Sequence, residues 1–96
     1  MSVELGAGIT VSHATLAQIV VQAAESVDGA RVRRPRRGLE VAVEGGRARV
    51  ELELAAQHGA VLPELARAVQ ERVGEALRTM CGLEPAAVDV SIEELE

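Results

Sequence analysis

Apolar and polar residues alternate along four segments of the chain, which is the period of strands with one buried face. Two of these segments, 39–44 (LEVAVE) and 47–56 (RARVELELAA), are separated by two glycines. Because both glycines adopt positive φ readily, the pair predicts a tight turn and an antiparallel hairpin. If position 44 faces position 47, Val41 lies opposite Val50 and the apolar side chains of both strands share one face.

The other two alternating segments lie near the ends of the chain. Residues 3–11 (VELGAGITV) alternate, but Gly6 and Gly8 weaken the first half of this segment because glycine lowers strand stability. The prediction of a strand is therefore strongest for residues 8–11. Residues 87–93 (AVDVSIE) alternate without interruption. We expect one strand from each of these two segments.

Two further segments have the three- and four-residue spacing of an amphipathic helix. The first follows Ser12, whose hydroxyl is suited to cap a helix, and it ends at Asp28-Gly29. The second begins at Leu62-Pro63, where proline in the first turn loses no hydrogen bond, and it ends at Gly82. The predicted apolar stripe of the second helix is Leu65, Ala66, Val69, Val73, Ala76, Leu77 and Met80.

The order of these elements, βαββαβ, predicts an α+β fold. Each strand has one apolar face and each helix one apolar stripe, so we expect two layers, with both helices packed on one face of a three- to four-stranded sheet. The second helix either crosses between parallel strands or returns to an antiparallel neighbour, and a ferredoxin-like split βαβ arrangement fits the order best. The length predicts a single domain over residues 1–96.

The composition limits the available chemistry. The 96 residues include no aromatic one, so the core must be aliphatic, and neither bases nor sugars can stack on an aromatic ring. The single cysteine, Cys81, excludes an intramolecular disulfide and is compatible with a reducing cytosol. The N-terminus lacks the basic and apolar regions of a secretory signal, and the uncharged runs are too polar to span a bilayer. We therefore expect a cytoplasmic domain.

Several motifs are shared with one protein family. Residues 8–12 (GITVS) precede the first predicted helix, Val-Asp-Gly at 27–29 ends it, and a longer pattern runs from Gly59 to Val90. In the order and spacing of these motifs the chain resembles the alkaline shock protein family over residues 8–92. The resemblance implies a non-enzymatic role in stress response and cell-envelope homeostasis, in which the protein acts as an interaction or scaffold module.

The resemblance also implies a location and partners. Family members gather at the inner face of the cell membrane through partner proteins, and some are anchored themselves. The chain departs from the family at His58, where an aromatic residue is common, and at Cys81, where threonine is common. It carries no anchor segment, so we expect no direct membrane insertion. The implied partners are proteins, either further copies of this chain in a homo-oligomer or a membrane-anchored relative.

Residues 31–37 (RVRRPRR) concentrate positive charge in a chain whose formal net charge is −5. Pro35 predicts an irregular, exposed segment between the first helix and the hairpin. Three interpretations remain open: a solvated loop, a contact with an acidic protein surface or anionic lipid headgroups, and a nucleic-acid contact. Nucleic acid is disfavoured because the rest of the chain is acidic and lacks aromatic residues for stacking. The candidate residues are Arg31, Arg33, Arg34, Arg36 and Arg37.

The hairpin supplies an acidic counterpart to these arginines. Its polar residues are expected on the sheet face that the helices leave open, where the arginines of a second copy can reach them. Such a contact is heterologous and builds rings or filaments. The candidate residues are Glu40, Glu44, Glu51 and Glu53. The alternative function is a small binding domain that uses the Arg31–Arg37 segment for nucleic acid or anionic lipid headgroups.

No group of residues has the spacing of a catalytic or metal site. His13 and His58 do not form a metal-ligand motif with Cys81, and Ser12 and Ser91 have no base near them in the sequence. The thiol of Cys81 falls at the end of a helix, where the helix dipole disfavours a thiolate. The sequence predicts no enzymatic activity, cofactor, metal or small-molecule substrate.

Overall fold

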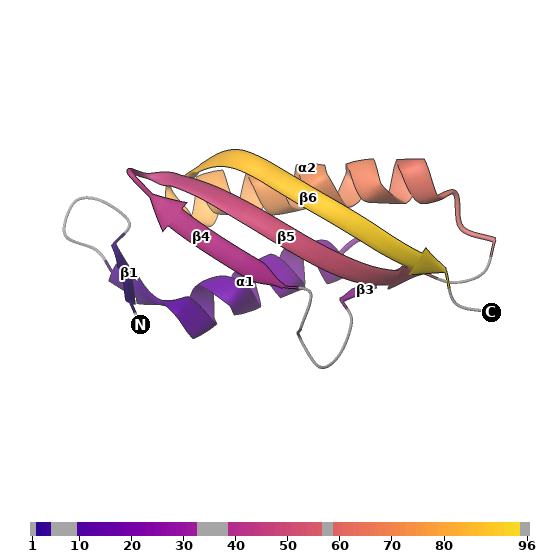
Figure 1. The fold of residues 1–96 in the computed structure, drawn as a ribbon, viewed down its shortest axis with the longest axis horizontal. Coiled ribbons are helices and arrows are strands. Elements are labelled where there is room, and N and C mark those ends of the chain that lie inside the picture. Colours follow the sequence, from indigo (N-terminus) through magenta and orange to yellow (C-terminus); the bar gives the residue numbers. More distant parts are fainter. Residues whose placement is uncertain (1, 5–9, 33–38, 57–58, 95–96) are drawn as a thin grey trace.

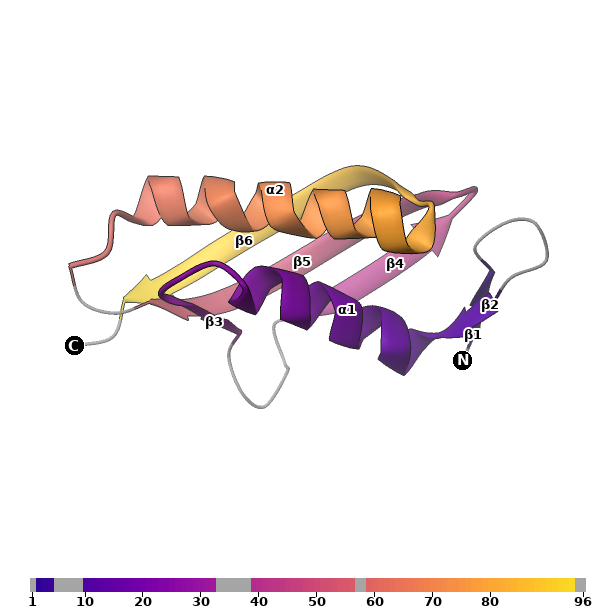
Figure 2. The same cartoon turned by 180° about the vertical axis from the view of Figure 1, so that it is seen from behind.

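The computed structural model describes residues 2–4, 10–32, 39–56 and 59–94. Two helices pack on one face of a β-sheet in a two-layer α+β fold (Figures 1 and 2), which confirms the predicted fold class. The helices are α1 (His13–Glu25) and α2 (Leu62–Cys81), and the strands of this sheet are β3 (Ala30–Val32), β4 (Glu40–Glu44), β5 (Arg47–Ala56) and β6 (Glu84–Glu94).

β5 is the central strand of the sheet. β4 pairs antiparallel with its first half, and β3 pairs antiparallel with its last residues, where Ala30 faces Ala56. β3 and β4 therefore follow one another along the same side of β5. β6 runs parallel to β5 on the other side, from Arg47 opposite Glu84 to Ala56 opposite Glu94. The sheet thus contains both parallel and antiparallel pairs.

The β4–β5 hairpin has the predicted register. Glu44 faces Arg47, and Val41 faces Val50 on the buried side. The two glycines of the turn have positive φ values of 58° and 77°. This conformation suits a tight hairpin because its twist matches that of the flanking strands.

α2 connects the parallel strands β5 and β6, which decides between the two alternatives that the sequence left open. Gly82 ends the helix in the left-handed conformation, with φ of 64°. The Leu83 N–H then donates to the Leu77 carbonyl, and the Glu84 N–H donates to the Gly46 carbonyl, both at 2.9 Å. These hydrogen bonds place the start of β6 directly beside β5. In a ferredoxin-like split βαβ unit another strand lies between the two parallel strands, so that predicted arrangement is wrong for this connection.

The first predicted strand differs from the structure. The described residues at the two ends of this segment add no strand to the main sheet; β1 (Ser2–Glu4) and β2 (Thr10–Ser12) instead pair antiparallel with each other in a separate two-stranded sheet. Gly6 and Gly8 lie outside the described residues. Because β6 occupies one side of β5 and β3 with β4 the other, the N-terminal segment has no free place beside the central strand.

α1 begins as predicted but ends earlier. The Ser12 hydroxyl caps it by accepting a hydrogen bond of 3.0 Å from the Thr15 N–H. Glu25 is the last helical residue, and Gly29, with φ of 88°, turns the chain into β3. β3 was not predicted because three residues are too few to establish an alternating pattern.

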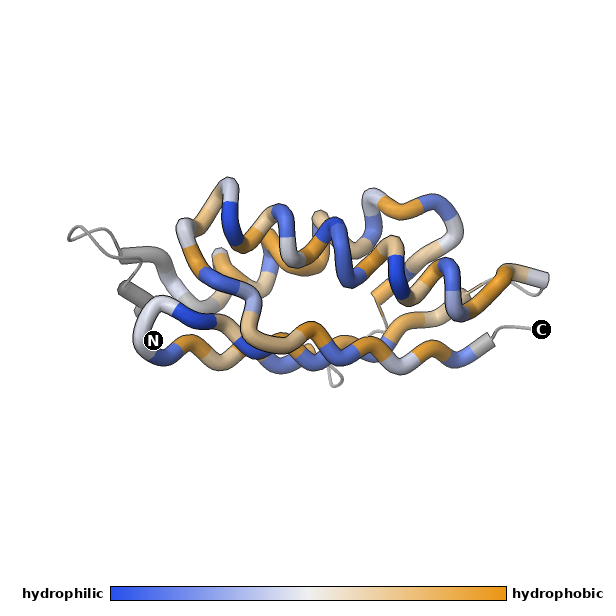
Figure 3. Tube along the Cα trace, turned by 90° about the horizontal axis from the view of Figure 1, so that it is seen from above, coloured by the Kyte–Doolittle hydropathy of each residue, from blue (hydrophilic) through white to orange (hydrophobic). Residues whose placement is uncertain are grey.

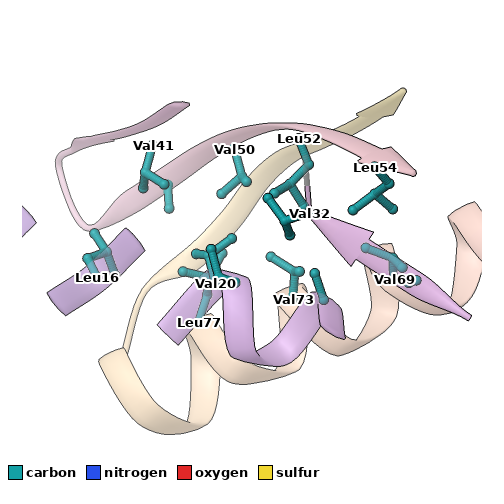
Figure 4. Packing of buried hydrophobic residues seen from close by; sticks show 14 of the residues in the cluster. Leu16, Val20, Val32, Val41, Val50, Leu52, Leu54, Val69, Val73 and Leu77 are labelled. Atoms are coloured by element: carbon teal, nitrogen blue, oxygen red, sulfur yellow. The ribbon is translucent and has the colours of Figure 1, made fainter. Parts of the chain in front are cut away.

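The core is aliphatic and fills the space between sheet and helices. Figure 3 shows the two layers from the side, with orange and blue positions alternating along the strands. In Figure 4, Val50 and Leu52 of β5 point towards Val20 of α1 and Val73 of α2. All the buried side chains in the described part of the chain are apolar. Complete burial of one such aliphatic side chain stabilises a fold by roughly 1.5–3 kcal/mol.

The apolar stripe of α2 departs from the prediction at its last turn. Met80 is 64% exposed, whereas Cys81 is only 3% exposed. The buried positions Val69, Val73, Leu77 and Cys81 follow one another in steps of four residues. Since a helix has 3.6 residues per turn, this row drifts around the axis and leaves Met80 outside the core.

Candidate interaction surface

The face of the sheet opposite the helices is polar and is not covered by any described element (Figure 1). The charged residues of β5 are exposed and alternate with buried aliphatic ones. The same alternation exposes the glutamates at both ends of β4. We call this surface the open face. It carries the acidic residues singled out from the sequence, Glu40, Glu44, Glu51 and Glu53.

Three carboxylates form a row across the open face. Glu40 of β4 faces Glu51 of β5, and Glu51 in turn faces Asp89 of β6. All three residues are exposed. Opposed residues of neighbouring strands have Cβ atoms about 4.5–5.5 Å apart, and like charges at such positions destabilise a sheet. This acidic row therefore concentrates negative charge at a cost to the stability of the domain.

The rows nearer the β4–β5 turn are more balanced. Arg47 lies between Glu44 and Glu84, so that opposite charges are adjacent. Arg49 lies between two alanines in the next row. On the other side of the acidic row, Glu53 faces Ser91 and extends the negative region. The open face thus has a positive contribution near the turn and a negative centre.

Of the predicted basic segment, the structure describes Arg31 and Val32, which belong to β3 and not to an irregular segment as predicted. Arg31 is the one candidate arginine among them. This side chain is exposed between two buried neighbours of β3, and it lies opposite Ala55 on the open face. The remaining candidates, Arg33, Arg34, Arg36 and Arg37, lie outside the described residues. The basic segment therefore begins on the same face as the acidic row, one register step beyond Glu53.

A shallow groove of about 560 Å³ runs between α1 and α2 on the other side of the molecule. Apolar side chains, among them Ile19 and Met80, lie beside polar ones along this groove. Arg72 crosses it and donates a hydrogen bond of 3.3 Å to the Ser26 hydroxyl. This contact joins the outer sides of the two helices.

Cys81 lies in the core at the end of α2. Burial raises the pKa of its thiol above the ordinary value, because the low-dielectric surroundings disfavour the thiolate. In the described ranges, His, Cys, Asp and Glu side chains form no group of three or more that could hold a metal ion. Neither described helix is long and apolar enough to cross a bilayer.

The sequence model of the alkaline shock protein family, described as having a cell envelope-related function, matches residues 3–96. The chain belongs to this family. The resemblance inferred from its motifs is thereby confirmed for almost the whole length. A search of curated proteins found no relative of the chain.

Solved structures with a similar fold include several forms of MamM CTD. One carrying a histidine-to-alanine substitution has 23% identity and a TM-score of 0.69, covering 88% of this chain and 99% of its own. A copper form has 23% identity and a TM-score of 0.68, covering 86% and 98%. A nickel form has 22% identity and a TM-score of 0.68, covering 86% and 99%. At this identity the likeness concerns the fold alone.

Sequence reasoning missed Asp89 on the open face and the contact of Gln70 with β6. Asp89 completes the acidic row, but its place beside Glu51 depends on β6 being the parallel neighbour of β5. Gln70 of α2 donates a hydrogen bond of 3.0 Å to the Val88 carbonyl of β6. The sequence signal for these contacts was the alternating segment that follows the second predicted helix. That pattern predicts a strand, but it does not specify which strand is its neighbour in the sheet.

Proposed function

We propose that this protein is a non-enzymatic interaction module that supports the cell envelope, and that a partner recruits it to the cytoplasmic face of the membrane. Family membership supports the envelope role. The acidic row supports the binding role and is the observation on which the proposal rests. The fold holds three exposed carboxylates side by side, and a basic protein surface placed against them would relieve their mutual repulsion.

The partner of the open face is a protein with a basic surface. Two sources fit this chemistry. One is the Arg31–Arg37 segment of a second copy, which would make a heterologous contact and extend into rings or filaments. The other is a membrane-anchored relative, which would bring the protein to the membrane.

The alternative role, binding of nucleic acid or anionic lipid headgroups, depends on the same basic segment. Phosphate groups attract arginine without regard to sequence, and such binding weakens steeply as the salt concentration rises. It does not use the acidic row, which repels a polyanion. The two roles therefore respond in opposite ways to a change of charge on the open face.

Charge reversal at the centre of the acidic row tests the proposal. We expect a fluorescent fusion of the parent protein to concentrate at the cell periphery in the native host. Glu51→Arg should spread it through the cytoplasm, because the basic partner no longer binds. Glu75→Arg, a charge reversal at an exposed position of α2, should localise like the parent.

Each failure has a distinct meaning. If Glu51→Arg remains folded and still concentrates at the periphery, the open face is not the recruiting surface. If the parent itself is evenly distributed, recruitment to the membrane is wrong. Stronger binding of Glu51→Arg to nucleic acid or to anionic vesicles than the parent shows, with peripheral localisation kept, would favour the alternative role.

A further inference from the structure

β6 forms one edge of the sheet. It pairs with β5 from Glu84 to Glu94, and no strand in the described parts of the chain lies along its other side. We call this side the β6 edge. A long strand edge presents unpaired N–H and C=O groups and is a ready template for a further strand. The shape and charge of this edge indicate which strand it accepts.

The hydrogen bond from Gln70 shows which residues point outward. Its side chain comes from α2 and reaches the Val88 carbonyl at 3.0 Å, so this carbonyl is directed away from β5. In a parallel pair, a residue turns both its N–H and its C=O to the same side, and the next residue turns them to the other. Val90 and Ile92 therefore present their backbone groups outward, as Val88 does.

The side chains at the edge are also incompletely covered. Val88, Val90 and Ile92 pack against the core but are only partly buried. Their neighbours in β5, at positions 50, 52 and 54, are at most 2% exposed. The apolar layer under the helices thus continues to the β6 edge and ends there with accessible aliphatic surface.

We propose that the β6 edge is a self-association surface, on which β6 of a second copy pairs antiparallel about a two-fold axis through Val90. In this register Val88 faces Ile92 of the second copy, and the two Val90 residues exchange backbone hydrogen bonds. All these residues have outward backbone groups and lie on the apolar side of the sheet. The paired sheets share one continuous apolar layer.

Charge selects this register over its neighbours. Centred on Val90, the pairing sets Asp89 opposite Ser91 of the second copy, and Ala87 opposite Glu93. Centred on Asp89, it would place the two Asp89 carboxylates directly opposite each other. Centred on Ser91, it would oppose Asp89 and Glu93. A shift by a single residue between partners would turn apolar side chains to the open face.

α2 is compatible with the same arrangement. Its flank beside the start of β6 carries Arg67, Glu71 and Arg78, which lie next to Ala86 and Val88. A two-fold axis perpendicular to the sheet keeps both copies of α2 on one side and sets them antiparallel. The isologous contact closes as a dimer, unlike the heterologous contact of the open face.

This inference does not rest on the proposed function, because it uses the outward backbone of β6 and not the acidic row. Asp89 and Ser91 also lie on the open face, but a basic partner bound there would respond to the substitutions below with the opposite signs. The matched test is a pair of substitutions at one exposed position. Ser91→Glu sets a like charge against Asp89 of the second copy, and Ser91→Arg sets an opposite charge there. Each pairing occurs twice in the dimer. We expect the first to weaken dimerisation by roughly two- to thirtyfold and the second to strengthen it.

Sedimentation equilibrium over a concentration series measures the effect, and thermal melting of each variant shows that the fold is kept. Ala42→Glu and Ala42→Arg make the same changes at an exposed position of β4 and should leave dimerisation unchanged. The proposal is wrong if the parent protein stays monomeric at all concentrations. In that case the β6 edge would be available to pair with an extended segment of another protein. A dimer that responds at Ala42 but not at Ser91 overturns the proposal as well.

A disulfide cross-link between two copies tests the position of the proposed two-fold axis. In a Cys81→Ala background, Val90→Cys places two thiols on residues whose Cα atoms are about 5.5 Å apart, within disulfide range. We expect a covalent dimer on mild oxidation, and none from Ala42→Cys in the same background. Equal cross-linking at both positions would show random collision and would contradict the proposed axis.

Discussion

The two edges of the sheet are built in different ways. The β6 edge is one strand that runs the length of β5. The opposite edge consists of β3 and β4, which are short and are separated in the sequence by a segment with four arginines and Pro35. We call this second side the β3/β4 edge. Short strands, charge and proline are features by which proteins prevent unwanted strand pairing.

Side chains also cover the two edges to different extents. At the β3/β4 edge, the Val32 N–H donates a hydrogen bond of 3.0 Å to the Glu25 carboxylate of α1. β3 is only three residues long, so this single bond occupies much of its outward backbone. At the β6 edge, Gln70 reaches one carbonyl of a strand of 11 residues. One sheet thus has a protected edge and an accessible edge, and the accessible edge is the place where we expect a second copy.

The largest predicted effect on stability is in β5, the central strand that lies between the two edges. Leu52 is 2% exposed beneath the helices, so Leu52→Ala leaves a cavity and should lower the free energy of unfolding by roughly 2–5 kcal/mol. Glu53→Ala, the next residue on the open face, should change it by less than about 0.5 kcal/mol. Urea denaturation of both variants measures the difference. Equal costs at the two positions would contradict the assignment of faces.

The next largest effect on stability distinguishes the backbone groups of β6 that point to β5 from those that point outward. Ser91→Pro removes an N–H that points to β5 and should destabilise the monomer by about 1–3 kcal/mol through the lost ladder bond. Val90→Pro removes an outward N–H, so it should destabilise the monomer less and abolish dimerisation. Denaturation and sedimentation of the two variants provide the readouts. The reverse order of stabilities would mean that the outward residues have been assigned wrongly.

A pH effect is expected at Cys81, which anchors the helix end from which β6 starts. Because burial raises its pKa, the folded state favours the neutral thiol. The resulting stability is complete below the ordinary thiol pKa of about 8.5 and is lost as the pH rises through the folded-state value. The parent should therefore lose more stability than Cys81→Ala between neutral and alkaline pH, as thermal melting can measure. Parallel curves would show that the thiol is not desolvated.

The smallest effect on stability is expected at the β3/β4 edge. Replacing Arg31, Arg33, Arg34, Arg36 and Arg37 by serine should change the free energy of unfolding by less than about 0.5 kcal/mol, because Arg31 is exposed and makes no described core contact. The same variant should lose any salt-dependent binding to nucleic acid or anionic vesicles. Mobility-shift and vesicle co-sedimentation assays measure this binding. A variant that binds like the parent excludes the basic segment as the site.

The parts of the fold that the sequence predicts are those decided by local pattern. The register of the β4–β5 hairpin follows from two glycines between alternating runs, and the start of α1 follows from Ser12 and the helical spacing after it. The open face follows from the same alternation. These features depend on residues that are close together in the chain, so the local sequence pattern is enough to predict them.

What the sequence leaves undecided depends on contacts between distant segments. Alternation in β6 shows that one face is buried, but not that its neighbour is β5 or that the pair is parallel. For this reason Asp89 could not be placed beside Glu51. The separate β1–β2 pair and the burial of Cys81 in place of Met80 likewise result from how the assembled layers fit together.

The difference between the two edges is tested most directly by amide hydrogen exchange at low and high protein concentration. We predict that the N–H groups of Val90 and Ile92 exchange rapidly when the protein is dilute and become protected as it associates. Protection along β4 should stay the same across the series. Exchange at the β6 edge that does not change with concentration, in a protein that nevertheless self-associates, would show that copies meet at another surface.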